Sequence, residues 1–300
     1  MNKHPLRPIT TEDVARFRED GAICVRNVLD GEWCERMKVA VERLLLNPGK
    51  RAREATKAGD PGRFHMNVFV WRWDPDFREL ALHSPLPELG ATLLGADRVS
   101  LFYDQAFIKE SGTRSVTDWH QDLPFWPALG NDIVSLWVAL TPVTVEGSGV
   151  EYVAGSHKWA KFYSAVTPDN DTKFSNTNLE ECPDFSQHRN DPQYRFLSWE
   201  CDAGDVICHH PLVVHGASGN ASSSRRAAIS IHYAGSDARW DPRPNVMKIE
   251  GEPENTLRAG DPLVLDAVFP IAWERARAQV INDSLKREPK TGRAPSFPSV

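Results

Sequence analysis

Hydrophobic residues have helical spacing in the first third of the chain. Apolar side chains recur three and four positions apart in three segments, which predicts helices over residues 11–20, 30–46 and 77–94. Thr10, followed by acidic residues, is a typical helix start, and Gly21 is a typical helix end. Between the helices we expect a short strand at 22–25 and a polar, mobile loop at 51–63. Residues 1–97 are therefore predicted to form an N-terminal helical layer.

From residue 98 the hydrophobic pattern becomes that of strands. Short runs rich in β-branched and aromatic residues are separated by Gly, Pro, Asn and Asp. These runs predict strands over residues 99–108, 133–140, 150–153, 205–208 and 227–233. The segments between them lack the long periodic helices that parallel strands require as crossovers. Residues 98–235 are therefore predicted to be an antiparallel sandwich or barrel, so that the fold is mainly β with some α.

The remaining segments are polar or rich in proline. Residues 167–194 lack periodicity and form an insertion between strands, which we expect to act as a mobile cover. Residues 236–300 form a proline-rich C-terminal extension, with a last helix predicted over 272–286 and a loose tail from residue 288. We expect the helical layer, the β core and the extension to form one domain, residues 1–300.

Composition excludes several classes of function. A formal net charge of −6 offers no basic footprint for nucleic acid, and no apolar run is long enough to span a membrane. The N-terminus lacks an apolar signal core, so we expect a cytoplasmic protein. The five cysteines are scattered and lack a Cys-x-x-Cys pair, which favours free thiols over disulfides or structural zinc. We expect a small-molecule substrate and a monomer or homodimer.

Candidate metal ligands occur in the sequence His120-Gln121-Asp122. If this tripeptide is extended, the side chains of His120 and Asp122 point to one face and can hold two adjacent corners of a metal ion. A second histidine would complete the two-His-one-carboxylate set that is typical of non-haem Fe(II) oxygenases. Residues 209–215 offer His209, His210 and His215. We favour His215 because small residues follow it and leave room beside a metal, whereas the other two are more often structural.

An arginine follows at the start of an apolar strand. If residues 212–215 and 226–233 are antiparallel neighbours, Arg226 lies near His215. The guanidinium group is permanently charged and matches a carboxylate with two parallel donors. Arg226 is therefore predicted to bind the distal carboxylate of a dicarboxylic acid whose other end chelates the metal. Arg225 is the alternative, but it belongs to a serine-rich loop where a solvated arginine needs no ligand.

These residues belong to an ordered series of short motifs. The series comprises His120-Gln121-Asp122, Trp137 in a Ser-x-Trp-x-Ala-Leu strand, Val153-Ala154-Gly155-Ser156-His157, Ala203-Gly204-Asp205, His215-Gly216, Asn220 and Arg226. Each motif alone is weak, but their order is specific. The chain resembles the phytanoyl-CoA dioxygenase family of Fe(II)- and 2-oxoglutarate-dependent oxygenases over roughly residues 17–233.

The resemblance implies a fold, cofactors and a reaction. It implies a double-stranded β-helix, also called a jelly roll or cupin-like barrel, in which His120, Asp122 and His215 bind Fe(II) and Arg226 binds 2-oxoglutarate. O₂ is then used to oxidise a substrate, with release of succinate and CO₂. Further candidates for contact with 2-oxoglutarate are Gln105, Trp137 and Ser230. The expected outcome is hydroxylation, because related halogenases have Ala or Gly where Asp122 stands.

One position departs from the family pattern. Family members often carry Ser or Thr two residues after the distal histidine, and this chain has Ala217 there. The hydrogen bond that such a hydroxyl makes to the cosubstrate would have to come from Ser218, Ser230 or a water molecule.

The substrate pocket is predicted from aromatic residues near the metal pair. Leu123-Pro124-Phe125-Trp126-Pro127 is apolar and stiffened by two prolines, so Phe125 and Trp126 are candidate walls for a moderately sized, largely apolar substrate. Asn67, within the aromatic segment 65–71, is a candidate polar contact. The competing interpretation is that both rings are part of the core.

Two other functions are compatible with the same ligands. Two histidines and one carboxylate also suit Zn²⁺, so a zinc-dependent hydrolase or lyase on a cupin-like barrel is one alternative. Zinc would leave Arg226 without an explanation, and no general base is marked out. A metal-free barrel that only binds a ligand is the other alternative, against which the intact ligand set argues.

Overall fold

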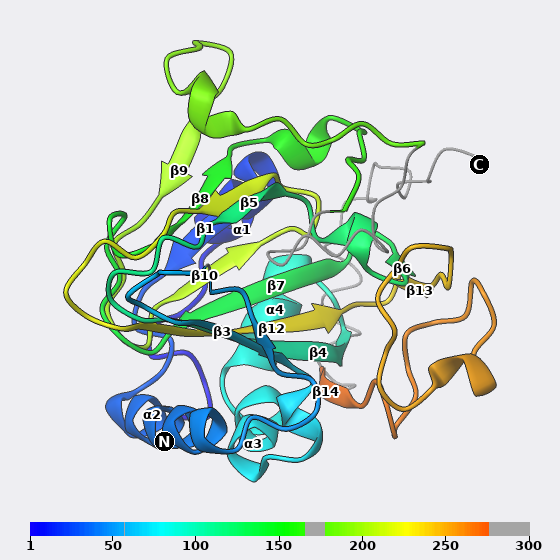
Figure 1. Ribbon diagram of the computed structural model, residues 1–300. Helices are drawn as coiled ribbons and strands as arrows, with labels where there is room; N and C mark the ends of the chain where they lie inside the picture. Colours follow the sequence, from blue (N-terminus) through cyan, green and yellow to red (C-terminus); the bar gives the residue numbers. More distant parts are fainter. Residues whose placement is uncertain (57, 166–177, 276–300) are drawn as a thin grey trace.

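The computed structural model describes residues 1–56, 58–165 and 178–275. Helices and two β-sheets lie in layers, with α2 and α3 below the large sheet and the small sheet above it (Figure 1). The helices are α1 (Thr11–Asp20), α2 (Gly31–Leu46), α3 (Pro75–His83) and α4 (Leu86–Leu94). They form the predicted N-terminal helical layer. None of the helices in the described ranges is long and apolar enough to cross a membrane.

The ends of the first helix follow from its sequence. The Thr10 side chain accepts a hydrogen bond from the Asp13 backbone, and the Asp13 side chain accepts one from the Thr10 backbone, which is a capping box. Gly21 closes the helix in the left-handed conformation, with φ of 79°. This sharp stop leads the chain directly into β1, an edge strand of the large sheet.

The large sheet has eight strands and is antiparallel throughout. Its strands run in the order β1-β10-β7-β12-β4-β3-β2, and β14 pairs with β4. Their bounds are β1 Ala22–Val25, β10 Val206–His209, β7 Ile133–Ala139, β12 Arg226–Ala234, β4 Arg98–Lys109, β3 Phe64–Val68, β2 Arg53–Glu54 and β14 Ile271–Glu274.

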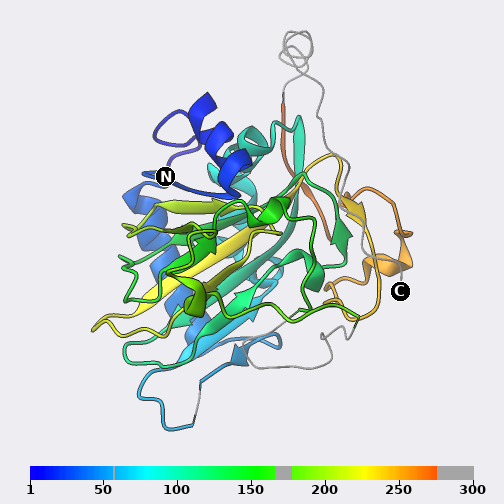
Figure 2. The ribbon, with the colours of Figure 1, turned by 90° about the horizontal axis from the view of Figure 1, so that it is seen from above.

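The small sheet faces the large one. It has the order β5-β11-β8-β9, with bounds β5 Thr117–His120, β11 His215–Ala217, β8 Val150–Val153 and β9 Phe196–Ser198. A two-stranded ribbon of β6 (Ala128–Leu129) and β13 (Arg239–Trp240) lies at one end, beside the C-terminal extension drawn in orange (Figures 1 and 2). The two facing antiparallel sheets confirm the predicted double-stranded β-helix.

Both faces of the central strands are buried. Along β12, Ala227, Ile229, Ile231 and Tyr233 pack against the helical layer. The alternate residues, among them Arg226, Ser230 and His232, face the space between the sheets. The large sheet therefore separates an apolar core from a polar-lined pocket.

Three predictions about elements need correction, and some short strands were not predicted. The polar loop at 51–63 contains the short strand β2, and β9 was not predicted. Residues 272–274 belong to strand β14 instead of a last helix, because they pair with the edge of β4; the helix predicted beyond residue 275 and the tail lie outside the described residues. In the insertion at 167–194, residues 178–194 are described and include a 3-10 turn at Phe185–His188, and the others lie outside the described residues. The segments 212–215 and 226–233 are not paired with each other: within 212–215 only His215 belongs to a strand, β11 of the small sheet, whereas residues 226–233 belong to β12 of the large sheet.

Candidate active site

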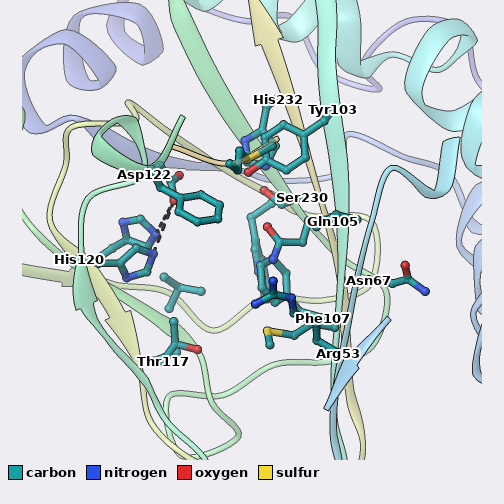
Figure 3. A pocket seen from close by; sticks show the side chains of 18 of the residues that line it. Arg53, Asn67, Tyr103, Gln105, Phe107, Thr117, His120, Asp122, Ser230 and His232 are labelled. Atoms are coloured by element: carbon teal, nitrogen blue, oxygen red, sulfur yellow. Dashed lines mark ion pairs between the residues drawn. The ribbon is translucent and has the colours of Figure 1, made fainter. Parts of the chain in front are cut away.

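Three candidate metal ligands meet at the small sheet. His215 on β11 is paired directly opposite His120 on β5. Asp122 lies just beyond β5 with a helical backbone and precedes the 3-10 turn η2 (Leu123–Phe125), so the expectation of an extended tripeptide is wrong at this residue. Its Oδ1 atom nevertheless lies 3.5 Å from Nε2 of His120 and 3.8 Å from Nε2 of His215 (Figure 3). The three side chains thus each present one donor atom to a common point.

Backbone contacts orient the two imidazoles. Nδ1 of His120 lies 2.7 Å from the carbonyl oxygen of Asp118, and Nδ1 of His215 lies 3.0 Å from that of Val213. A proton on each Nδ1 satisfies these carbonyls and leaves the lone pair of each Nε2 directed at the common point. Histidines that bind metals are usually held in this way by their second nitrogen.

Asp122 is held so that one carboxylate oxygen stays available. Its Oδ2 accepts hydrogen bonds from Nε2 of His209 at 3.2 Å and from Oγ of Ser135 at 3.3 Å. Burial opposes ionisation of this carboxyl, but the surrounding imidazoles, His215 first, hold its pKa well below the usual value. Oδ1 is therefore a charged donor that faces His120 and His215.

The pKa of His215 also suits metal binding. Burial, followed by the neighbouring imidazole of His120, holds its pKa well below the usual value. This burial favours the neutral imidazole, which is the form that binds a metal. The residues present fit a divalent cation with nitrogen and oxygen ligands, the set preferred by non-haem iron.

The other two candidate histidines have different surroundings. His209 contacts Asp122 through Nε2, and its Nδ1 lies 3.2 Å from the hydroxyl of Tyr152, so it supports the aspartate. Nδ1 of His210 accepts a hydrogen bond from the backbone of Leu212 at 3.1 Å, and burial lowers its pKa to about 3. His210 is absent from the residues that line the pocket. This geometry supports the choice of His215.

The pocket between the sheets has a volume of about 740 Å³. The candidate metal ligands line one wall, formed by the small sheet and η2, and the pocket-facing side chains of β4, β7 and β12 line the wall opposite (Figure 3). A volume of this size falls within the range of small-molecule sites, which is roughly 300–1,000 Å³.

Arg226 lies on the wall opposite His215, and both residues face the same pocket. Its side chain is 3% exposed, and Nη1 and Nη2 contact the carbonyl of Phe107 at 3.3 Å and Oγ of Ser148 at 3.2 Å. Nε has no hydrogen-bond partner, and no carboxylate of the described residues forms an ion pair with this guanidinium. Burial lowers its pKa to about 10, so it remains charged at neutral pH. A buried, uncompensated cation facing a pocket favours an anionic ligand.

Arg225 has its charge compensated at the surface. Its Nε lies 2.7 Å from a carboxylate oxygen of Glu110, and its guanidinium also pairs with Glu42. It does not line the pocket. The contrast supports Arg226 over Arg225.

The predicted cosubstrate contacts lie together on the large sheet. Ser230 on β12 is paired with Gln105 on β4 on one side and with Trp137 on β7 on the other, and all three line the pocket. The guanidinium of Arg226 stacks over the ring of Trp137, with 5.6 Å from its central carbon to the ring centroid. Ser218 is not among the lining residues.

The predicted substrate contacts are only partly brought together. Phe125 lines the pocket, but Trp126 does not; it is buried and donates from Nε1 to the hydroxyl of Tyr103 at 2.8 Å, so it supports the wall from behind. Asn67 lies on β3 opposite Ala106, a residue of the helix-facing core, and its amide donates to the carbonyl of Pro48. Asn67 is nevertheless among the residues that line the pocket, and Figure 3 labels it as one of them. Its contact with substrate stays a prediction.

Several pocket residues were missed by the sequence analysis. Thr117 on β5 is paired with Ala217 and lines the pocket, so it can place a hydroxyl next to the position where relatives carry one. His232 stacks on Tyr103 with ring centroids 4.2 Å apart and bonds Oγ of Ser135 at 2.8 Å. The alternation of strand β12 places His232 on the same face as Arg226, and this pattern could have identified it.

Comparisons with known proteins agree with this geometry. The family model of Phytanoyl-CoA dioxygenase (PhyH) matches residues 17–228. A phytanoyl-CoA dioxygenase of Arabidopsis thaliana is 28% identical over 56% of this chain and 56% of that protein, so the match spans little more than half of its length. The peroxisomal phytanoyl-CoA dioxygenase of Rattus norvegicus is 29% identical over 75% of this chain and 68% of that protein.

Solved structures share the same fold. The carbocyclase SnoK of nogalamycin biosynthesis, described as non-heme and alpha-ketoglutarate-dependent, is 26% identical with a TM-score of 0.67, over 88% of this chain and 96% of that chain. The epimerase SnoN, solved with Fe³⁺, alpha-ketoglutarate and nogalamycin RO, has a TM-score of 0.67 at 24% identity over 87% and 97% of the two chains. The second likeness concerns the fold alone.

Proposed function

Because the chain belongs to the phytanoyl-CoA dioxygenase family, we propose that it is an Fe(II)- and 2-oxoglutarate-dependent dioxygenase. It oxidises a C–H bond of a small, largely apolar organic molecule, most simply by hydroxylation, and releases succinate and CO₂. This proposal rests on the two facing walls of the pocket, one of which can bind a metal ion while the other can bind a carboxylate. One wall presents Nε2 of His120, Oδ1 of Asp122 and Nε2 of His215, and the other presents the uncompensated guanidinium of Arg226.

Each protein group has a defined task. His120, Asp122 and His215 hold the metal, and the carbonyls of Asp118 and Val213 fix the two imidazole orientations. Bound Fe(II) supplies the redox chemistry that couples decarboxylation of 2-oxoglutarate by O₂ to oxidation of the substrate.

Arg226 orients the cosubstrate. Its planar fork holds the distal carboxylate of 2-oxoglutarate, and Trp137, Ser230 and Gln105 line the space between that carboxylate and the metal wall. Thr117 supplies the hydroxyl that Ala217 lacks. This arrangement directs the 2-oxo acid end toward His120, Asp122 and His215.

The walls around this centre favour an apolar substrate. Met66, Val68, Phe107, Phe125 and Met247 line the pocket, which is larger than 2-oxoglutarate needs. Such side chains recognise shape and exclude water from the reacting centre. The relatives act on different compounds by name, among them ectoine for a protein of Streptomyces avermitilis and hypophosphite for one of Stutzerimonas stutzeri, so the family alone does not select the substrate.

The decisive experiment measures succinate formation by the purified protein. We expect succinate from 2-oxoglutarate only when Fe(II) and O₂ are both supplied, and we expect Asp122→Ala to abolish it. Fe(II) binding by the wild type with no 2-oxoglutarate turnover, or hydrolytic activity supported by Zn²⁺, would favour the zinc alternative instead. Failure to bind any metal would favour a binding module.

A carboxylate at position 122 also bears on the reaction outcome. The carboxylate of Asp122 occupies a coordination position of the metal that halogenases of this family leave open for chloride. We therefore propose a hydroxylase and not a halogenase. Chlorinated product from the wild-type protein in chloride buffer would contradict this. We further propose a cytoplasmic monomer or homodimer, which cell fractionation and size-exclusion chromatography can test.

A further inference from the structure

Charged residues are segregated within the pocket. Its acidic lining residues in the described part of the chain are Asp118 and Asp122, both beside the metal-binding wall. Its cationic lining residues, apart from Arg226, are Lys50, Arg51, Arg53 and Lys248, and we call these four the basic rim. The chain as a whole has a net charge of −6, so the charge of the basic rim is opposite in sign to that of the whole molecule.

The basic rim is assembled from two segments that are distant in sequence. Lys50, Arg51 and Arg53 precede or begin β2, and Lys248 comes from the C-terminal extension. Arg51 contacts residues of both the N-terminal region and the C-terminal extension. Its guanidinium lies over the ring of Phe69, 5.6 Å from the ring centroid, and 3.6 Å from a carboxylate oxygen of Glu250. The extension thus returns to the mouth of the pocket and adds its lysine to cations from the N-terminal region.

Most of the rim charge is available to a ligand. Lys50 and Lys248 are exposed and form no ion pair within the described ranges of the chain. The ion pair of Arg51 with Glu250 is long and exposed, so it contributes little. Cations that converge at the mouth of a cleft with low-dielectric walls concentrate anions there.

The apolar walls lie between the basic rim and the metal wall. Figure 3 shows Arg53 on the side of the pocket opposite His120 and Asp122. Phe107 and Met66 line the same part of the pocket as β2, and Phe125 lines the part near the metal ligands. A molecule that spans this space would have one end at the cations and its body against the rings.

We propose that the substrate is an amphipathic anion whose carboxylate or phosphate binds the basic rim while its apolar body extends toward the metal wall. This inference rests on the proposed function and names the substrate class of the same pocket. The carbon that is oxidised is then remote from the anionic group, because the basic rim and the metal wall lie on different sides of the pocket. Arg226 remains reserved for the cosubstrate.

The test measures equilibrium binding to the metal-loaded protein with 2-oxoglutarate under argon. The probes are decanoate, decyl phosphate and the neutral decanamide, which have similar apolar bodies. We expect at least one of the two anions to bind about fivefold to tenfold more tightly than the amide, as a few exposed ion pairs allow. The more tightly bound anion identifies the preferred head group.

Variants assign the preference to the rim. The double variant Lys50→Gln/Lys248→Gln should reduce the preference for the anion to about twofold or less, and added NaCl should reduce it in the wild type. The matched control is Lys3→Gln/Lys38→Gln, which removes two lysines whose recorded ion pairs are with Glu79 and Glu35 and should keep the preference.

Three results would overturn the inference: equal binding of anions and amide, no binding of any probe, or a preference that survives the double variant. Failure of the proposed function is a separate result, namely no succinate from 2-oxoglutarate in the wild type. A protein that forms succinate but does not distinguish decanoate or decyl phosphate from decanamide would keep the function and lose the substrate class.

Discussion

At the scale of residues, the tautomer of each imidazole decides which histidines can bind metal. His215 has Nδ1 engaged with a backbone carbonyl and Nε2 free, whereas His210 uses Nδ1 as an acceptor and lies outside the pocket. We expect His215→Ala to weaken metal binding by about a hundredfold or more, since loss of a supporting partner alone costs 10–100-fold. His210→Ala should keep metal affinity. Equilibrium dialysis with Fe(II) or Co(II) measures both, and the reverse result would contradict the ligand assignment.

Arg226 is predicted to act on 2-oxoglutarate and not on the metal. Arg226→Lys keeps a positive charge but loses the two-pronged donor geometry, so we expect the KM for 2-oxoglutarate to rise about tenfold with unchanged metal affinity. Arg225→Lys is the matched control, and steady-state succinate assays compare the two. An unchanged KM in Arg226→Lys together with a raised KM in Arg225→Lys would reverse the assignment.

Asp104 couples the stability of the fold to pH. Its carboxyl is fully buried on β4, where Oδ2 accepts from the backbone of Trp71, and burial raises its pKa to about 8. The folded protein therefore keeps a proton that the unfolded chain releases above about pH 4. The contribution to stability is complete below pH 4 and is lost as the pH rises toward 8, by up to about 1.4 kcal/mol per pH unit.

Removing this carboxyl should remove that pH dependence. We expect Asp104→Asn to make the free energy of unfolding less sensitive to pH between 5 and 9 than in the wild type. Urea denaturation at both pH values gives the comparison. Parallel pH profiles of variant and wild type would show that Asp104 is ionised in the folded protein.

Residue identities were more predictable than side-chain directions. The motif series placed His120, Asp122, His215 and Arg226 in one pocket, because metal and cosubstrate chemistry restricts residue type and order. Trp126 was expected to line the pocket beside Phe125, but it lies behind the wall and donates to the hydroxyl of Tyr103. A run of neighbouring aromatic residues does not indicate which of their side chains faces a pocket.

At the scale of elements, the turn η2 separates two neighbouring rings. Phe125 lines the pocket, and Trp126 packs with Phe102, Tyr103 and His232 behind the wall. Arg243 supports this turn by donating to the carbonyl of Leu123 at 2.8 Å. The two rings are therefore expected to respond differently to truncation.

Phe125→Ala should uncouple the reaction, with succinate formed in excess of oxidised product, while the fold remains stable. Trp126→Ala should destabilise the protein by about 3–5 kcal/mol because it removes a buried ring. Product-to-succinate ratios and urea denaturation distinguish these outcomes. If Phe125→Ala keeps full coupling, Phe125 is structural and the proposed wall is misplaced.

Long helices and strands were predictable from the sequence. Very short strands, and the assignment of strands to one sheet or the other, were not. The helices and the strands β4, β7 and β12 have enough residues to show a clear period. β2 and β9, with two and three residues, exist because neighbouring strands pair with them. The segments 212–215 and 226–233 are close in sequence, but the chain crosses between sheets from one to the other, and no local pattern records that crossing.

At the scale of the whole molecule, the site is divided between the two sheets. The candidate metal ligands lie on or beside β5 and β11, and Arg226, Ser230, Gln105 and Trp137 lie on the large sheet. Under the proposed function, 2-oxoglutarate that chelates the metal and pairs with Arg226 would connect the two sheets. Folding and ligand binding are linked, because a ligand that binds only the folded state stabilises it.

We expect metal and 2-oxoglutarate to stabilise the protein together by more than the sum of their separate effects. At about a hundredfold excess over its Kd, one ligand adds about 2.7 kcal/mol to the free energy of unfolding. Thermal unfolding with Mn²⁺, 2-oxoglutarate or both gives the comparison in the absence of turnover. Additive effects would mean that the two ligands bind independently.

The division of the site between facing sheets also sets a length requirement on the 2-oxo acid. The separation between Arg226 and the metal ligands is fixed by the packing of two hydrogen-bonded sheets, and a closely packed interior changes its spacing little. If Arg226 and the candidate metal ligands hold the two ends of the cosubstrate, as proposed, a 2-oxo diacid one methylene shorter, such as oxaloacetate, should engage one of them but not both. The two facing sheets would then select a five-carbon diacid by its length.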